Sequence, residues 1–322
     1  MRAAWVATAG LVVIGFAVVA LVAREHTPAS AQSRTPRQVA APDSKSAMPD
    51  AANPSSSLDD ESVPQNTSVS RDLEKELMDS EDFWGFAEKL LVEAKAGDGA
   101  AQFYLSIALS ECDAFGTNYF KDGDRRLTYD EAMQHAVQRG GFKWEYVSRV
   151  FKRCKRLIEA KNPPFGTADA WMNAAIASGY PRAQAQAAVG KAWKSRYEEQ
   201  KERASELREE ARHLALAALR TKDPGAMFMV GSAASVLDKR EGDANPHEWV
   251  WMLAACERGY DCSRESAWYQ FRCAYDPQCQ PYENGIVDVV RRETGSRFSD
   301  LERRAKELNA RMDEGRFDEL GI

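Results

Sequence analysis

The chain has 322 residues, of which 44% are apolar and 29% are charged, and its formal net charge is -6. This balance supports a folded core, and the negative net charge gives no reason to expect a nucleic-acid partner, although it does not exclude a local basic surface. A chain of this length has room for one extended repeat array or for two compact domains.

Residues 1–23 contain an uncharged apolar run, Ala3–Ala23, between Arg2 and Arg24. Its 21 residues can span a bilayer as a helix, whereas a cleaved signal has an apolar region of roughly 7 to 15 residues. The length favours a transmembrane anchor. Residues 29–31 have the small-x-small pattern that signal peptidases cut, so a cleaved signal peptide is the alternative. Either segment carries the rest of the chain across a membrane.

Residues 24–70 are rich in Pro, Ser, Ala and Asp and contain almost no large apolar side chains. Such a segment cannot bury enough surface to offset the entropy lost on ordering, which predicts a disordered linker. From residue 71 the pattern becomes helical, without strict alternation of apolar and polar residues. We therefore predict an all-α chain beyond the linker.

Five segments of the helical region share one pattern, an apolar helix followed by a break and a second helix. The breaks fall at Gly97, Gly140, Gly179, Lys222 and Gly259, with separations of 43, 39, 43 and 37 residues. Glycine readily adopts the left-handed conformation that ends a helix, so these four glycines are predicted structural turns. The period predicts an α-solenoid of about five antiparallel helix pairs over residues 71–283, with a concave groove built from the first helices.

Residues 284–322 add further helix with a highly charged pattern, which suits the polar outer cap that a solenoid needs. Ser299 and Glu302 have the spacing of a capping box, so we expect Ser299 to begin the last helix.

Two of the breaks lie in similar runs, AKAGDGAAQ at residues 94–102 and AIASGYPRAQ at residues 175–184. These runs resemble the Sel-one-like repeats, relatives of the tetratricopeptide repeats, and the resemblance covers roughly residues 85–280. It implies a scaffold that presents a concave surface to partner proteins. It implies no catalytic residues.

All six cysteines lie beyond the N-terminal apolar run: Cys112, Cys154, Cys256, Cys262, Cys273 and Cys279. An even number after an export segment predicts disulfides in an oxidising compartment. Buried free thiols are one alternative, and a zinc site built from the last four cysteines is another, although no CxxC pair occurs.

Cys112 and Cys154 lie 15 and 14 residues after their breaks, at matching places on the second helices of neighbouring repeats. We expect them to form a disulfide, which requires α-carbons about 4.4 to 6.8 Å apart. The last four cysteines allow three connectivities. We favour the local pairs Cys256–Cys262 and Cys273–Cys279, because a helix between Cys262 and Cys279 would separate them by about 25 Å.

Arg149, Lys152, Arg153 and Arg156 recur at helical spacing and form a predicted basic stripe. It can bind an anionic partner, a lipid headgroup or an acidic polymer. The alternative, which we favour, is a solvated helix face balanced by neighbouring acids.

Aromatic residues gather in the last repeat, as Trp249, Trp251, Trp268, Tyr269 and Phe271. We expect most of them in the core, because such side chains bury large areas between packed helices. An exposed one would mark a binding surface.

Signatures of catalysis are few. The four histidines are His26, His135, His213 and His247. Glu210 and His213 have the Glu-x-x-His spacing of di-iron bundles, but no second such motif occurs and the surrounding charges indicate a solvated helix face.

Residues 120–131 have several acidic positions of a calcium-binding EF-hand loop. Phe120 replaces the first ligand, however, and Arg125 replaces the turn glycine. We predict a polar interhelical loop in which Thr128 caps the next helix, and we expect neither a metal nor a cofactor.

Together these features predict a bacterial envelope protein in the periplasm, tethered to the inner membrane if the N-terminal helix stays uncleaved. We expect a non-catalytic scaffold or adaptor that binds an envelope protein. The alternative is a helical hydrolase or metal-dependent enzyme acting on envelope polymer, with His135, His213 or His247 near acidic residues.

Overall fold

The computed structural model describes residues 72–122, 125–160, 163–237, 247–276, 279 and 283–322. The predicted anchor or signal at residues 1–23 and the predicted linker at 24–70 lie outside the described residues. Within them, no helix is long and apolar enough to cross a membrane. The described part is all-α apart from one hairpin of two-residue strands, as predicted.

The helices and strands follow one another along the chain with short connections. Their bounds are α2 (Leu73–Asp79), α3 (Phe83–Lys95), α4 (Gly99–Tyr119), β1 (Lys121–Asp122), β2 (Arg125–Arg126), α5 (Tyr129–Gly140), α6 (Trp144–Glu159), α7 (Ala168–Ala177), α8 (Pro181–Tyr197), α9 (Lys201–Arg220), α10 (Pro224–Leu237), α11 (His247–Glu257), α12 (Ala267–Tyr275), α13 (Ile286–Thr294) and α14 (Phe298–Asp313), with 3-10 turns η2 (Gly295–Arg297) and η3 (Phe317–Glu319).

The predicted breaks are turns between consecutive helices, with one correction. Gly97, Gly179 and Gly259 have φ of 95°, 78° and 96°, and Lys222 adopts the same left-handed region at 60°. Gly140 is not the second turn, since it is the last residue of α5 and the left-handed residue is Gly141, with φ of 67°. Each of these left-handed residues ends a helix in the way that suits glycine best.

A separate reason explains why residue 140, although helical, is a glycine. A Cβ at this position would lie 2.5 Å from Cδ2 of Phe142, closer than any ordinary contact. The Gly140-Gly141 pair therefore combines one position that needs space and one that needs a left-handed backbone.

Short polar side chains start several of the helices. Asp98 accepts a hydrogen bond from the backbone of Ala101 at 2.7 Å, and Thr128 forms a capping box with Glu131, as predicted for the start of α5. The expected cap at Ser299 is wrong. The helix α14 continues directly from the η2 turn and has no side-chain cap, so Ser299 lies within its first turn.

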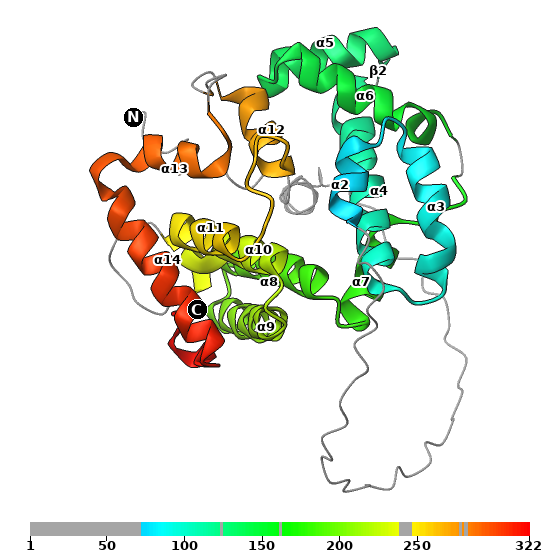
Figure 1. Ribbon diagram of the computed structural model, residues 1–322. Coiled ribbons are helices and arrows are strands. Elements are labelled where there is room, and N and C mark those ends of the chain that lie inside the picture. Colours follow the sequence, from blue (N-terminus) through cyan, green and yellow to red (C-terminus); the bar gives the residue numbers. More distant parts are fainter. Residues whose placement is uncertain (1–71, 123–124, 161–162, 238–246, 277–278, 280–282) are drawn as a thin grey trace, which may run out of the picture.

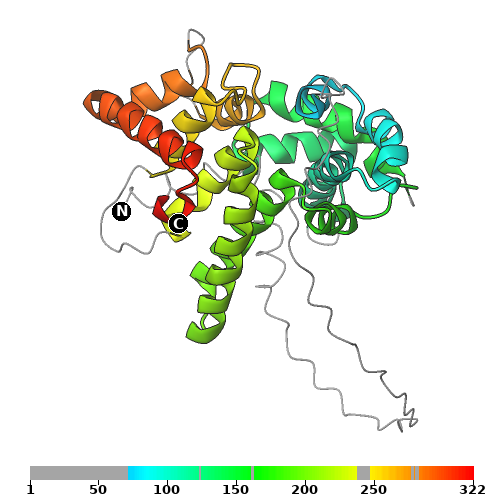
Figure 2. The same cartoon turned by 60° about the horizontal axis from the view of Figure 1, so that its bottom comes forward.

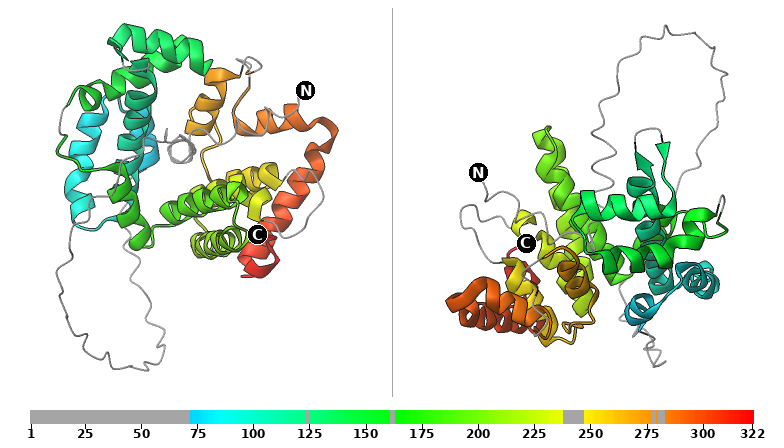
Figure 3. Two further views of the ribbon diagram at one scale, coloured as in Figure 1. Left: turned by 180° about the vertical axis from the view of Figure 1, so that it is seen from behind. Right: turned by 90° about the horizontal axis from the view of Figure 1, so that it is seen from above.

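The helices do not pack in simple chain order (Figures 1 and 3). α3 and α4 form a pair, but α4 then packs along α7, while α5 and α6 lie against α3 and α4 as a side branch. The array continues through α8, α9, α10 and α11, and α14 covers α11. The second pair therefore stands outside the sequence of neighbours that five successive repeats would give.

The helices α8, α9 and α10 form the most closely packed part, here called the stack. Figure 2 shows α8 and α9 side by side and reaching away from the other helices. Their shared core is rich in fully buried alanines: Ala185, Ala188, Ala192, Ala211, Ala215 and Ala218. Such small side chains let helix backbones approach closely and bury a continuous surface.

The helix α12, here called the closing helix, joins the two halves of the molecule (Figure 1). Its Phe271 packs against Phe142 beside α6 at 6.0 Å between ring centroids, and its Trp268 packs against Phe228 of α10 at 6.3 Å. The core forms two clusters, one mainly over α2 to α7 and one over α8 to α14. Phe271 belongs to the first cluster although its helix, α12, lies in sequence among the helices of the second. The closing helix thus connects the α5–α6 branch to α10.

Three disulfides pair all six cysteines. Cys112–Cys154 joins α4 to α6 with α-carbons 5.1 Å apart. Cys256–Cys262 and Cys273–Cys279 are local, at 5.7 and 5.2 Å, and they flank the closing helix. These are the pairs that the spacing predicts, and they indicate an oxidising environment.

Candidate binding cavity

The arrangement encloses a central cavity of about 1120 Å³, part of it open to solvent. Its lining comes from α2 and from the second helix of each predicted pair, with Phe103 on α4, Tyr146 on α6, Gln186 on α8, Met229 on α10 and Phe271 on α12. The expectation that first helices build the concave surface is therefore wrong.

The compositions of the helices explain this choice of face. The second helix α10 is apolar throughout, with Met227, Phe228 and Val230 almost fully buried. The first helix α9 has buried alanines on one side and a charged face, including Glu209, on the other. An apolar helix lowers the free energy by lying inside, while a charged face stays solvated.

One wall of the cavity is held by Arg182 at the start of α8. Its guanidinium donates to Glu74 of α2 at 2.5 Å, to Asp223 at 3.1 Å and to the hydroxyl of Tyr104 on α4. Tyr260 donates to the other oxygen of Glu74 at 3.2 Å. Burial raises the pKa of Glu74, although the charge of Arg182 opposes the rise. This network joins five parts of the chain at the cavity edge.

A second charged group lies on the walls formed by α4 and α6. Arg153 is only 7% exposed, and it donates to the backbone carbonyl of Met78 on α2. Burial raises the pKa of Glu111 on α4, while the charges of Arg153 and Arg149 oppose that rise. Two guanidinium groups therefore share one carboxyl group in this part of the cavity.

The predicted basic stripe is not an open anion-binding surface. Lys152 donates to Glu81 at 2.8 Å and Arg156 donates to Asp82 at 2.7 Å, both in the connection between α2 and α3. With Arg153 buried, three of the four cations already have partners within the chain. Arg149 differs, since it lines the central cavity and its guanidinium carbon lies 5.7 Å from the centre of the Tyr146 ring.

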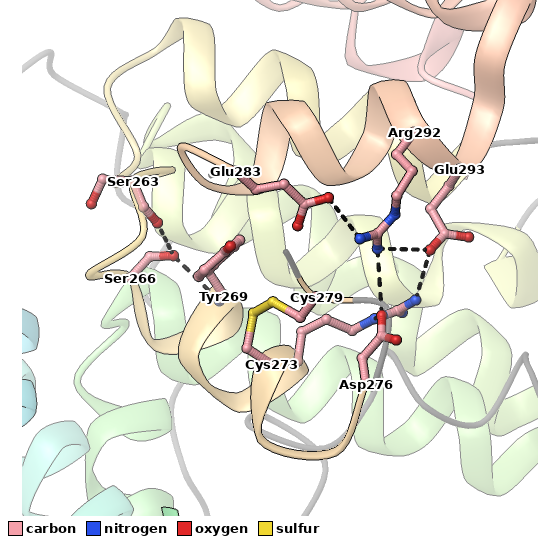
Figure 4. The surroundings of a disulfide bond; sticks show 10 residues. Ser263, Ser266, Tyr269, Cys273, Asp276, Cys279, Glu283, Arg292 and Glu293 are labelled. Atoms are coloured by element: carbon pink, nitrogen blue, oxygen red, sulfur yellow. Dashed lines mark hydrogen bonds and ion pairs between the residues drawn. A yellow bond between two sulfur atoms is a disulfide. The ribbon is translucent and has the colours of Figure 1, made fainter. Parts of the chain in front are cut away.

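Ionic contacts to α13 fix the closing helix beside the Cys273–Cys279 disulfide (Figure 4). Arg292 of α13 donates to Glu283 at 2.6 Å and to Asp276 at 3.4 Å. Arg272 of α12 donates to the same Asp276 at 3.1 Å. Glu283 and Asp276 are only 4% and 9% exposed, so solvent screens these contacts little. The wall that α12 contributes is therefore firmly placed.

The aromatic residues of the last repeat are mostly core, as predicted. Trp251, Trp268, Tyr269 and Phe271 are buried, and Trp249 is partly buried. Trp268 and Phe271 also line the central cavity. The sequence indicated their burial but not this second role.

The candidate metal ligands do not form a site in the part of the chain that is described. His135 has Nδ1 3.4 Å from the carbonyl oxygen of Tyr119, and His213 is exposed on α9. His26 and the side chain of His247 lie outside the described part. No group of three or more His, Cys, Asp or Glu among the described residues could hold a metal ion.

In the loop with partial EF-hand spacing, the carboxylate of Glu131 forms hydrogen bonds within the chain. Glu131, at the position of the last calcium ligand, accepts hydrogen bonds from the backbone of Thr128 at 2.8 Å and from Arg125 at 2.9 Å. These contacts lower the pKa of Glu131 and complete the cap of α5. The polar loop expected here agrees with this geometry.

Comparison of the chain with protein-family models, with curated proteins and with solved structures gave no match.

Proposed function

We propose that this protein is a non-catalytic binding scaffold of the bacterial cell envelope, and that the central cavity is where it engages an envelope partner. The proposal depends on which helices line the cavity. Every predicted pair contributes its second helix to one apolar cavity that also contains a few charged groups, the usual composition of a binding site.

We further propose that the helical domain is a modified α-solenoid of the Sel-one-like kind. The packing of α4 on α7, of α8 on α9 and α10, and of α10 on α11 supports a continuous array. The helix pair α5–α6 is a branch from it, and the closing helix connects this branch to α10. This closure would convert the open concave face of a solenoid into an enclosed cavity.

The proposed location is the periplasm, with the domain tethered to the inner membrane through residues 1–23 if that segment is uncleaved. Three disulfides support an oxidising compartment, and the apolar run of 21 residues supports export.

Position-specific photocrosslinking in intact cells tests the binding role. A photoreactive side chain replaces Met229, which lines the cavity, or Val92, which is 75% exposed on the outer helix α3. We expect the full chain to form a defined adduct with an envelope component from position 229 and not from position 92. Equal labelling from both positions, or none from position 229, would contradict the proposal.

A further inference from the structure

The central cavity contains one strong hydrogen-bond donor that the described part of the chain leaves unsatisfied. Nε of Arg149 is buried and has no hydrogen-bond partner, and none of the described carboxylates forms an ion pair with this guanidinium. A buried charged donor without an acceptor is unfavourable, so a ligand that supplies an acceptor gains affinity from the contact.

The charge around Arg149 favours an anion. Arg153 is a second cation of this wall, and Glu111 is the single carboxyl group whose charge both arginines affect. Elsewhere on the lining, Arg182 is already paired with Glu74 and Asp223. The uncompensated positive charge of the cavity therefore lies on the α4 and α6 side.

The remaining walls are apolar and suit the flexible or aromatic apolar part of a ligand. They include Ile107, Phe115, Val150, Met229, Trp268 and Phe271. Burying apolar ligand surface against such walls is favourable by the ordinary hydrophobic effect. A ligand that satisfies the whole cavity thus has one acidic end and an apolar remainder.

The closure of the array limits the size of the ligand. The closing helix contacts both halves of the molecule, and α2 contributes Leu77 and Met78 to the same cavity. The cavity is thus bounded by helices on several sides, unlike the extended open groove that a folded protein partner would need.

We propose that the central cavity binds a small acidic amphiphile, an acyl chain with a carboxylate or phosphate head, with the head on Arg149 and the chain along the apolar walls. This inference rests on the proposed binding role of the cavity, and it makes the envelope partner at this site an amphiphile instead of a protein.

Equilibrium binding to the full chain in lipid nanodiscs tests the inference, with empty nanodiscs as the background. The probes are radiolabelled dodecanoate, dodecyl phosphate and dodecanol, which share one chain length and differ in the head. We expect dodecanoate or dodecyl phosphate to bind at least about tenfold more tightly than dodecanol, since a charge-assisted hydrogen bond contributes to the first two alone. The tighter of the two acids identifies the head.

Two variants on α6 separate the site from general charge effects. Arg149→Gln should weaken binding of the acidic probes by about tenfold to a hundredfold, whereas Arg156→Gln, which removes an exposed charge paired with Asp82, should leave binding unchanged. Circular-dichroism melting checks the fold of both. If Arg149→Gln does not fold, the comparison of acids with dodecanol in the unaltered chain decides alone.

Equal affinity for dodecanol and dodecanoate, or equal effects of the two variants, would overturn the inference. If no amphiphile binds but the adduct from position 229 persists, this inference is wrong and the binding role stands. If no amphiphile binds and no adduct forms from position 229, both proposals are refuted.

Discussion

The stack and the closing helix are held in place by different means. The stack, α8 to α10, buries a nearly continuous alanine surface and contains no cysteine. The closing helix has only nine residues and is flanked by two disulfides. It is joined to α13 through the ion pairs Arg272–Glu293 and Arg292–Asp276.

The difference follows from the surface that each can bury. Long helices with small side chains gain enough from close packing alone, because the buried area grows with helix length. A short helix that bridges two halves buries less against each, so covalent and ionic contacts must fix its position. If so, the stack should be sensitive to added volume, and the closing helix should be sensitive to loss of its disulfide.

Adding one methyl group where α10 of the stack packs against its neighbour α11 should have the largest effect. A Cβ on Gly231 would lie 2.4 Å from Cβ of Trp251, so Gly231→Ala should destabilise the fold by up to about 3 kcal/mol. The matched control is Gly116→Ala in α4, where the nearest atom would be 3.6 Å away. That change should stabilise by up to about 1 kcal/mol, since alanine is the better helix former. Urea unfolding measures both, and equal effects would refute the close-packing argument.

Removing the disulfide beside the closing helix should have an intermediate effect on stability and a large one on the cavity. Cys273→Ser with Cys279→Ser opens a short loop of six residues, so the loss should be about 2 kcal/mol. Hydrogen exchange should then rise in α12 and stay unchanged in α8 and α9. Faster exchange spread evenly over both regions would show that the closing helix is not a separate unit.

Relieving the strained turn at Lys222 should have the smallest effect. Lys222 adopts φ of 60° where the other turns use glycine, so Lys222→Gly should stabilise by about 0.5–1 kcal/mol. Thr221→Gly is the control, because Thr221 has ordinary helical φ of -74° and gains nothing from glycine there. Thermal unfolding distinguishes the two, and a lower melting temperature for Lys222→Gly would contradict the expectation.

The candidate site was much less accessible to sequence reasoning than the fold. Arg149 was singled out, but as part of a surface stripe whose other members prove to be paired or buried. Nothing in the spacing marked Glu74, Glu111 or Arg182, because their partners come from helices up to 108 residues away. Helical spacing shows which residues share a face, but it does not show which other element covers that face.

The sequence by itself determined the all-α class and most of the turns, because glycine conformation, proline position and helical periodicity are local properties. It also determined the three disulfide pairs, because their spacing along the predicted helices limits which cysteines can meet. Only the tertiary structure decided that α4 packs on α7, that Gly141 and not Gly140 makes the second turn, and that second helices line the cavity. These outcomes depend on how volumes and charges from distant segments fit together, which no local pattern encodes.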